Sequence, residues 1–94
     1  MWQIEEHRRV DKQLSGVAPI EILKRYEKWK DIARISGPQG LRAIKGFHDE
    51  ALFGEWKGHR SSRLGLQFRV IYRVAAKVLQ IQVVQVTAHD YRKP

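Results

Sequence analysis

The feature that most constrains the fold is an unbroken alternation of apolar and polar residues in the C-terminal half. Apolar side chains occupy every second position from residue 64 to residue 74, namely Leu64, Leu66, Phe68, Val70, Tyr72 and Val74. A period of two residues is the repeat of a β-strand. The pattern predicts a strand whose opposite face carries Arg63, Gln67, Arg69, Ile71 and Arg73.

A second strand is predicted at residues 78–87, directly after the first. It is apolar on both faces after Ile81, which is typical of a central strand that is buried on both sides. The residues that follow it, His89 to Arg92, come at the exit of this strand.

Shorter patterns complete the expected order of elements. We expect strands at residues 2–7 and 55–60, a short helix at 8–14, a turn beginning at Ser61-Ser62, and mostly loop at 41–54. The order strand, helix, helix and three strands predicts an α+β fold. The N-terminal strand and the two helices would pack on one face of a mainly antiparallel four-stranded sheet, and residues 1–94 would form a single domain.

The second helix is predicted to begin at Pro19 and to end at Gly37-Pro38. Its apolar residues recur at helical spacing and form one stripe, made of Leu23, Tyr26, Trp29, Ile32 and Ala33. We interpret the aromatic members of this stripe as core residues, because a platform for stacking bases would have to be exposed.

Charge gives the clearest indication of a partner. Eighteen lysines and arginines oppose ten acidic residues, so the chain carries a net charge of +8. Such a balance favours a polyanion such as RNA or DNA, although a basic surface with no dedicated partner has the same composition. The chain contains no cysteine, no apolar run of a signal peptide and no membrane-spanning stretch, so we expect a cytoplasmic protein.

The functional groups in the last 45 residues suit cleavage of RNA without a metal. In that reaction the 2′-hydroxyl attacks the neighbouring phosphorus, which requires a base, cations for the phosphorane oxygens and an acid for the leaving oxygen. The candidates are Glu50 in a loop, Arg69 in mid-strand on the exposed face, Lys57, His59, Arg60 and Arg63 on the neighbouring hairpin, and His89 at the strand end. Each one alone would more often be a solvated or paired side chain.

Other kinds of site find no support in the sequence. It has no phosphate-binding loop of the Walker type, no dinucleotide fingerprint and no zinc-protease motif. The four histidines are not spaced as metal ligands, and His48-Asp49 would need further ligands that the sequence does not display. We therefore expect no metal and no small-molecule cofactor.

At two places the chain resembles the RelE/ParE superfamily of type II toxins. The stretch Leu52-Phe53-Gly54-Glu55-Trp56-Lys57-Gly58-His59-Arg60 resembles the L-x-G-x-W-K-G-Y-R segment of YafQ-type toxins, and Phe68-Arg69-Val70-Ile71-Tyr72 resembles the [HY]-R-L-V-Y strand of YoeB and RelE. Length and element order are similar over nearly the whole chain.

The resemblance implies a ribosome-dependent mRNA endoribonuclease, held inactive by an antitoxin protein. It places a catalytic arginine at Arg69, a C-terminal catalytic histidine at His89 and a glutamate base at Glu50. Two departures stand out. Arg63 and Gln67 replace a histidine and an aspartate of YafQ, and Tyr91 comes one place later than the tyrosine of YoeB.

With this resemblance, we expect a nuclease that acts on mRNA in the 70S ribosome. Glu50 is the candidate general base and His89 the general acid or a partner in proton transfer. The phosphate would be bound by Arg69, Arg63 and Lys57, with His59 and Arg60 as secondary contacts and Tyr91 stacking on a base. Two alternatives remain: an inhibitor of DNA gyrase like the ParE branch, and a basic RNA- or ribosome-binding module without catalysis.

Overall fold

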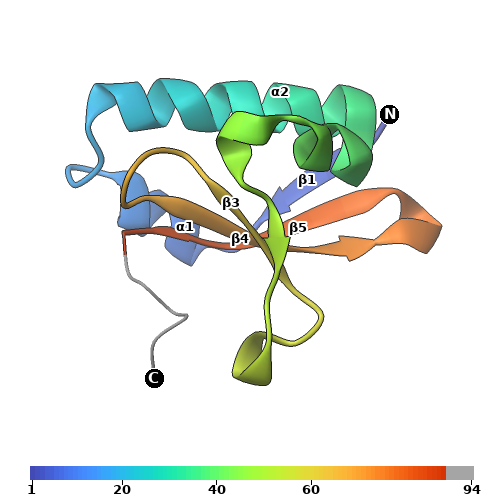
Figure 1. The fold of residues 1–94 in the computed structure, drawn as a ribbon. Coiled ribbons are helices and arrows are strands. Elements are labelled where there is room, and N and C mark those ends of the chain that lie inside the picture. Colours follow the sequence, from blue (N-terminus) through green and yellow to red (C-terminus); the bar gives the residue numbers. More distant parts are fainter. Residues whose placement is uncertain (89–94) are drawn as a thin grey trace.

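The computed structural model describes residues 1–88, which form a helix-covered sheet (Figure 1). The helices are α1 (Arg9–Leu14) and α2 (Ile20–Ala43). The strands are β1 (Gln3–Glu6), β2 (Glu50–Ala51), β3 (Arg60–Arg63), β4 (Arg69–Ala75) and β5 (Gln80–Thr87). Short 3-10 turns occur at η1 (Lys45–Phe47), η2 (Gly54–Trp56) and η3 (Ala76–Val78).

The five strands form one sheet in the order β1-β5-β4-β3-β2. Strand β1 runs parallel to β5, and all the other neighbours are antiparallel. The predicted α+β class and the mainly antiparallel sheet are confirmed. The sheet has one strand more than predicted, because β2 contributes two residues that pair with β3.

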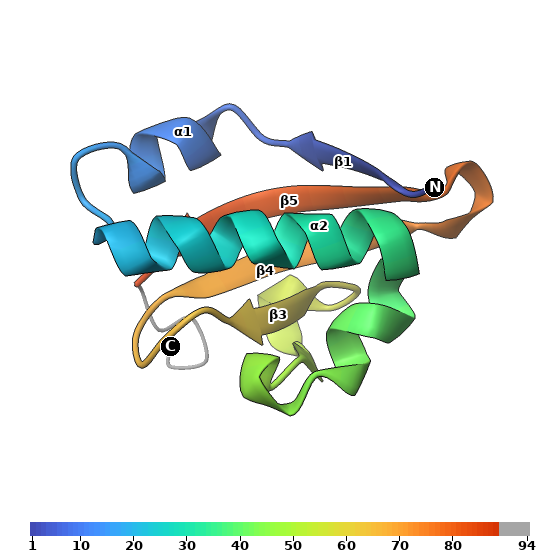
Figure 2. The same cartoon turned by 90° about the horizontal axis from the view of Figure 1, so that it is seen from above.

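Helix α2 covers one face of the sheet and lies along β4 and β5 (Figure 2). Its buried residues follow a helical period, and they are Ile22, Tyr26, Trp29, Ala33, Gly37 and Leu41. They pack with sheet residues such as Val70, Tyr72 and Ile81, each of which is fully buried. The predicted core stripe is thus confirmed, with Leu23 and Ile32 only partly buried.

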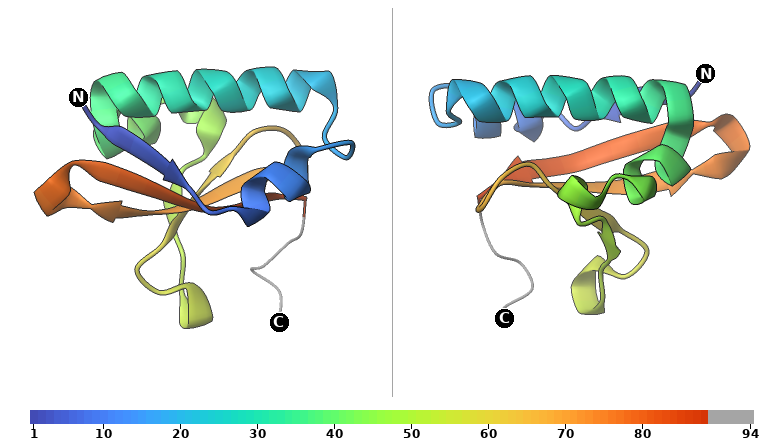
Figure 3. Two further views of the ribbon diagram at one scale, coloured as in Figure 1. Left: turned by 180° about the vertical axis from the view of Figure 1, so that it is seen from behind. Right: turned by 45° about the horizontal axis from the view of Figure 1, so that its top comes forward.

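Helix α1 packs beside β5, in the space that β1 leaves free. Figure 3 shows it level with the sheet, whereas α2 lies above the sheet. Gln13 of α1 replaces a strand partner, since its Oε1 accepts a hydrogen bond from the Val86 amide at 2.8 Å. Its Nε2 donates to Gln85 Oε1 at 3.2 Å. The first of these bonds satisfies a backbone donor of β5 beyond the end of its pairing with β1.

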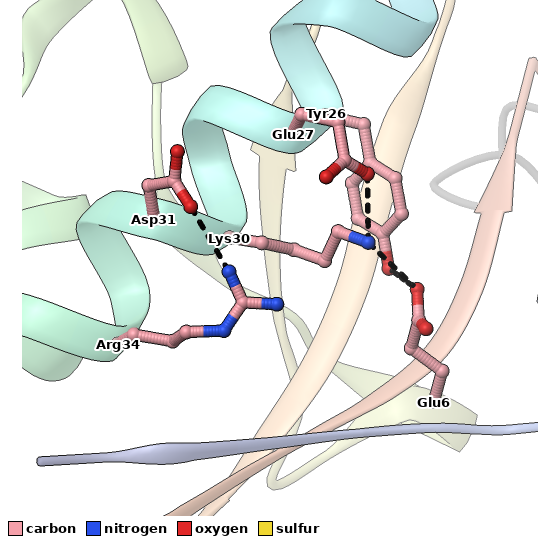
Figure 4. Close-up of polar contacts among 6 residues, drawn as sticks. All are labelled: Glu6, Tyr26, Glu27, Lys30, Asp31 and Arg34. Carbon is pink, nitrogen blue, oxygen red and sulfur yellow. Dashed lines mark hydrogen bonds and ion pairs between the residues drawn. The ribbon is translucent and has the colours of Figure 1, made fainter.

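Four residues tie β1 to α2 (Figure 4). The Tyr26 hydroxyl donates to Glu6 Oε2 at 2.5 Å. The Nζ atom of Lys30 lies 3.6 Å from Glu6 Oε2 and 2.8 Å from Glu27 Oε2. The same atom lies over the Tyr26 ring, 4.7 Å from the ring centre. Burial, and then the hydrogen bond to Glu6, raises the pKa of Tyr26 far above its usual value, so this phenol stays a donor.

Gly37 breaks α2 at the predicted place, but the helix does not end there. Its backbone has φ 65° and ψ −163°, and Pro38 begins a further helical segment that reaches Ala43. The Trp2 side chain leaves no room for a larger residue here, because a Cβ on Gly37 would lie 2.4 Å from Trp2 Nε1. The prediction of mostly loop at 41–54 was therefore wrong for its first three residues, for η1 and β2, and for Gly54, the first residue of η2.

Three predictions about the hairpin strands were wrong. The strand expected at 55–60 is a loop around η2 except for Arg60, which begins β3, because Gly54 and Gly58 adopt positive φ angles of 64° and 89°. Ser61 and Ser62 are buried inside β3 and do not begin a turn. The alternation from residue 64 does not mark a continuous strand, because residues 64–68 form the β3–β4 turn and β4 begins only at Arg69.

Replacing Gly37 by alanine tests this close approach. Its φ/ψ combination is essentially restricted to glycine, and the new methyl group would collide with Trp2. We expect Gly37→Ala to lower the free energy of unfolding by about 2–4 kcal/mol in urea titrations. Gly46→Ala is the control, since nothing lies within 4 Å of its Cβ position. Equal stability of the two variants would contradict the packing described.

Candidate active site

The sheet face away from α2, called here the open face, carries a group of polar and cationic side chains. Side chains alternate between faces along a strand, so Arg69, Ile71 and Arg73 lie on the open face while Val70 and Tyr72 lie in the core under α2. The loop at residues 52–59 projects on this same side (Figure 1). Ile71 is fully buried although it lies on the open face, which fits coverage by this loop.

Arg63 and Arg69 form a cross-strand pair on the open face. They are register partners in β3 and β4, and Thr87 of β5 continues the same row. Two like charges directly opposite each other destabilise a sheet. Arg69 is only 8% exposed, and the Nε atoms of both arginines are buried with no hydrogen-bond partner among residues 1–88. Buried donors of this kind are uncommon, and an anion between the two guanidinium groups would satisfy them.

The position of Arg69 partly corrects the prediction from sequence. The face was predicted correctly, but Arg69 begins β4 instead of lying in mid-strand, and it is buried instead of exposed. Burial makes the side chain a better anion receptor, because its charge is less screened by water.

His59 extends the group of unsatisfied donors and acceptors toward the loop. Its carbonyl accepts from the Leu52 amide at 3.0 Å, and its own amide donates to the Trp56 carbonyl at 2.9 Å. The rings of Trp56 and His59 meet edge to face at 5.3 Å. Nδ1 of His59 is buried and has no partner in the described part of the chain. Alternation along β3 puts Ser61 and Arg63 on the open face, and His59, which directly precedes β3, continues this alternation.

Glu50 reaches the open face from the outermost strand. It pairs with Ser61, which pairs in turn with Ile71, so Glu50 lies one row along from Arg63 and Arg69. Standard strand spacings put the Cα atoms of Glu50 and Arg69 about 12 Å apart, within reach of two long side chains that approach one phosphate. The structure therefore brings together four of the predicted residues, Glu50, His59, Arg63 and Arg69.

Arg60 does not join this group. Alternation turns it toward the α2 side, where its Nε donates to Asp49 Oδ1 at 2.6 Å. Burial alone would lower the pKa of Arg60, but the hydrogen bond and the charge of Asp49 outweigh it and raise the pKa. Arg60 is thus bound in a structural ion pair.

Asp49 is the residue that the sequence analysis missed. Its side chain is fully buried, and besides Arg60 it accepts hydrogen bonds from the Ser62 hydroxyl at 2.7 Å and the Tyr72 hydroxyl at 2.6 Å. Burial, followed by the bond to Asp49, raises the pKa of Tyr72. The only signal in the sequence was the polar Arg-Ser-Ser run of β3, whose buried members require a partner.

The remaining predicted residues have other positions. Lys57 is exposed at the end of η2, in the loop on the side of the open face. His89 and Tyr91 lie outside the described residues. Within residues 1–88 no helix is long and apolar enough to cross a membrane.

Comparison with known proteins supports the fold. No protein-family model matches the sequence, and no curated protein matches it significantly. Among solved structures, RelE in the archaeal RelE–RelB complex of Pyrococcus horikoshii is 26% identical, with a TM-score of 0.72 and 92% of both chains covered. The chain has the fold of the RelE/ParE-superfamily toxins.

Two further toxins of this superfamily give the same result at lower identity. The YoeB–YefM complex of Staphylococcus aureus contains a match at 17% identity and a TM-score of 0.71, covering 96% of this chain and 99% of the other. YafQ from E. coli matches at 14% identity and a TM-score of 0.67, covering 93% and 92%. The RelE-like fold thus spans nearly all of this chain.

The role of Asp49 leads to a stability prediction. Asp49→Asn removes the charge that compensates Arg60, and we expect it to lower the free energy of unfolding by about 2–4 kcal/mol, measured by chemical denaturation. Asp31→Asn breaks the exposed pair with Arg34 and should cost no more than about 0.5 kcal/mol. Similar effects of the two substitutions would show that Asp49 does not hold this region together.

Proposed function

We propose that this protein is the toxin of a type II toxin–antitoxin system and cleaves mRNA on the ribosome. The observation that carries the proposal is the cross-strand pair of Arg63 and Arg69 on the open face, whose Nε atoms are buried and have no hydrogen-bond partner among residues 1–88. Two guanidinium groups in one row fit the oxygens of a single phosphate, and arginine keeps its proton near neutral pH. The RelE-like fold supports the same function.

The chemistry proposed is attack by the 2′-hydroxyl on the adjacent phosphorus, without a metal. Glu50 would remove the proton of that hydroxyl, and Arg63 and Arg69 would stabilise the charge on the phosphorane oxygens. The reaction would leave a 2′,3′-cyclic phosphate and a 5′-hydroxyl. His89 would protonate the leaving oxygen or share in the proton transfer, and Tyr91 would stack on a base.

Other residues would have supporting roles. Lys57 would contact the RNA backbone from the exposed loop, and His59 would contact the phosphate from the edge of the site. Arg60, whose Nε is bound to Asp49, would act through the position of β3 and not through direct contact.

A protein antitoxin is the proposed partner. The RelE and YoeB matches are both found in complexes, with RelB and YefM respectively. Since residues 57–73 carry most of the cations around the open face, the antitoxin segment that covers them should be acidic or amphipathic. A partner whose contact segment is basic would count against this proposal.

The test is primer extension on an mRNA translated in the presence of the purified protein. We expect cuts at codon positions, with the rate reduced about 10²–10³-fold in Arg69→Ala because a cation for the developing charge is lost. His89→Ala should also lose the cuts. Arg42→Ala, at the exposed end of α2, is the matched control and should cleave like the wild type.

Two results would overturn the nuclease. Unchanged cleavage in a folded Arg69→Ala protein would remove the proposed site. Growth arrest in cells without mRNA cuts, together with inhibited DNA supercoiling by gyrase, would establish the ParE-like alternative. RNA binding that weakens with salt but never leads to cleavage would establish a binding module.

A further inference from the structure

The loop at residues 52–59, which projects on the side of the open face, carries two aromatic side chains that stay outside the core (Figure 1). Phe53 is 85% exposed. Trp56 is partly exposed, and its ring meets the His59 ring edge to face at 5.3 Å. Since His59 continues the open-face alternation of β3, this contact puts the Trp56 ring at the open face as well.

Hydrogen bonds within the loop fix the backbone that carries the two rings. The Leu52 amide donates to the His59 carbonyl at 3.0 Å and closes the base of the loop. At the tip, the Trp56 amide donates to the Phe53 carbonyl at 3.2 Å, and the His59 amide donates to the Trp56 carbonyl at 2.9 Å. A ligand that binds to a backbone already held in place loses little affinity to ordering of the loop.

The loop is anchored on the open face next to the arginine pair. Leu52 at the start of the loop is only 7% exposed, and Ile71 on the open face is fully buried. The core cluster under α2, as described for residues 1–88, includes neither of them. Small apolar clusters of this kind lie beneath loops. Ile71 follows Arg69 by two positions in β4, so their Cα atoms lie about 7 Å apart, and the loop approaches Arg69 in space.

The exposed groups of the loop have the chemistry that recognises an unpaired base. Bases stack on aromatic rings such as those of Phe53 and Trp56, and this stacking tolerates any base. Glu55 is exposed in the same turn and can accept a hydrogen bond from a base amino group. Lys57 is exposed directly after Trp56 and offers a cation to the RNA backbone.

The occupant must satisfy two demands that lie side by side on one face. The buried Nε atoms of Arg63 and Arg69 have no hydrogen-bond partner among residues 1–88, and an anion would satisfy them. The rings of the loop need a flat apolar group. A nucleotide carries both groups in one unit, whereas a peptide would need an acidic and an apolar side chain at matching positions. The two demands together favour RNA over a protein segment.

We propose that the loop at residues 52–59 stacks one base of single-stranded RNA on Phe53 and Trp56, next to the phosphate held by Arg63 and Arg69. The inference rests on the proposed function and adds a base-stacking site to it. Because the rings would read no base edge, this site would position the RNA strand on the open face without selecting its sequence.

The test is an NMR titration with uncleavable RNA trinucleotides that carry 2′-O-methyl groups. One has all its bases, and the others lack the base at one position, with each position tried in turn. The chain has three tryptophans, so the indole N–H of Trp56 reports on the loop. Trp29 in the core and Trp2 against Gly37 are internal references. The Nε–H signals of Arg63 and Arg69 report on the phosphate site.

We expect the complete trinucleotide to shift the Trp56 and arginine signals, and one abasic form to shift only the arginines. Phe53→Ala removes a ring that is 85% exposed, so folding is not at risk. It should weaken binding of the complete RNA about tenfold without affecting that abasic form. Leu66→Ala is the matched control, because Leu66 is 94% exposed and lines the hollow between the β3–β4 turn and α2, away from the loop.

The outcomes separate this inference from the proposed function. Shifts at the arginines, with equal affinity for complete and abasic RNAs, would overturn the base site and leave the phosphate site intact. A Trp56 signal that shifts with an acidic peptide of alternating glutamate and leucine, but with neither kind of RNA, would overturn it in favour of a protein partner. An absence of shifts at both groups would overturn the phosphate site as well, whereas ribosomal cleavage is decided independently by primer extension.

Discussion

The carboxylate of Asp49 is the interaction on which the functional half of the molecule depends. It is fully buried, and it accepts hydrogen bonds from Arg60 and Ser62 of β3 and from Tyr72 of β4. A buried charge is stable only when its hydrogen bonds are satisfied, so these three bonds fix β3 against β4 in one register. Alternation then turns the intervening residues of β3 to the opposite face.

The open face obtains its chemistry from this arrangement. With Arg60 and Ser62 held under α2, the neighbours Ser61 and Arg63 must face the other side, and the register places Arg63 opposite Arg69. The fold thus satisfies Arg60 with a buried acid, whereas the Nε atoms of Arg63 and Arg69 have no hydrogen-bond partner among residues 1–88. In the proposed function an external anion would bind this second set, and this connects the architecture with RNA cleavage.

Part of this could be predicted from the sequence. Local periodicity in the sequence predicts the helix α2 from its apolar stripe. It also predicts, from the alternation in β4, that Arg69 and Val70 lie on opposite faces of the sheet. Arg69 was identified as a candidate because the segment at residues 68–72 resembles a known toxin strand. Glu50 was predicted as a site residue in a loop, whereas the structure places it in β2, where its pairing with Ser61 puts it on the open face.

The remainder depends on contacts between distant residues. The alternation continues through residues 64–68, so no local signal separates the turn from the strand, and the turn is fixed by Arg25 of α2. Ser61 and Ser62 looked like turn residues because serine is usually exposed, but Asp49 makes the burial of Ser62 possible. Gly37 was recognised as a helix breaker, whereas its contact with Trp2, 35 positions earlier, has no sequence signature.

The most direct test of the central claim is the chemical nature of the ends left on mRNA cut in a translating ribosome. The proposed reaction leaves a 2′,3′-cyclic phosphate on the upstream fragment and a 5′-hydroxyl on the downstream fragment, because the 2′-hydroxyl is the nucleophile. Upstream fragments that end in a 3′-hydroxyl, with 5′-phosphates downstream, would show that water attacked instead. The open face would then not be the metal-free cleavage site described.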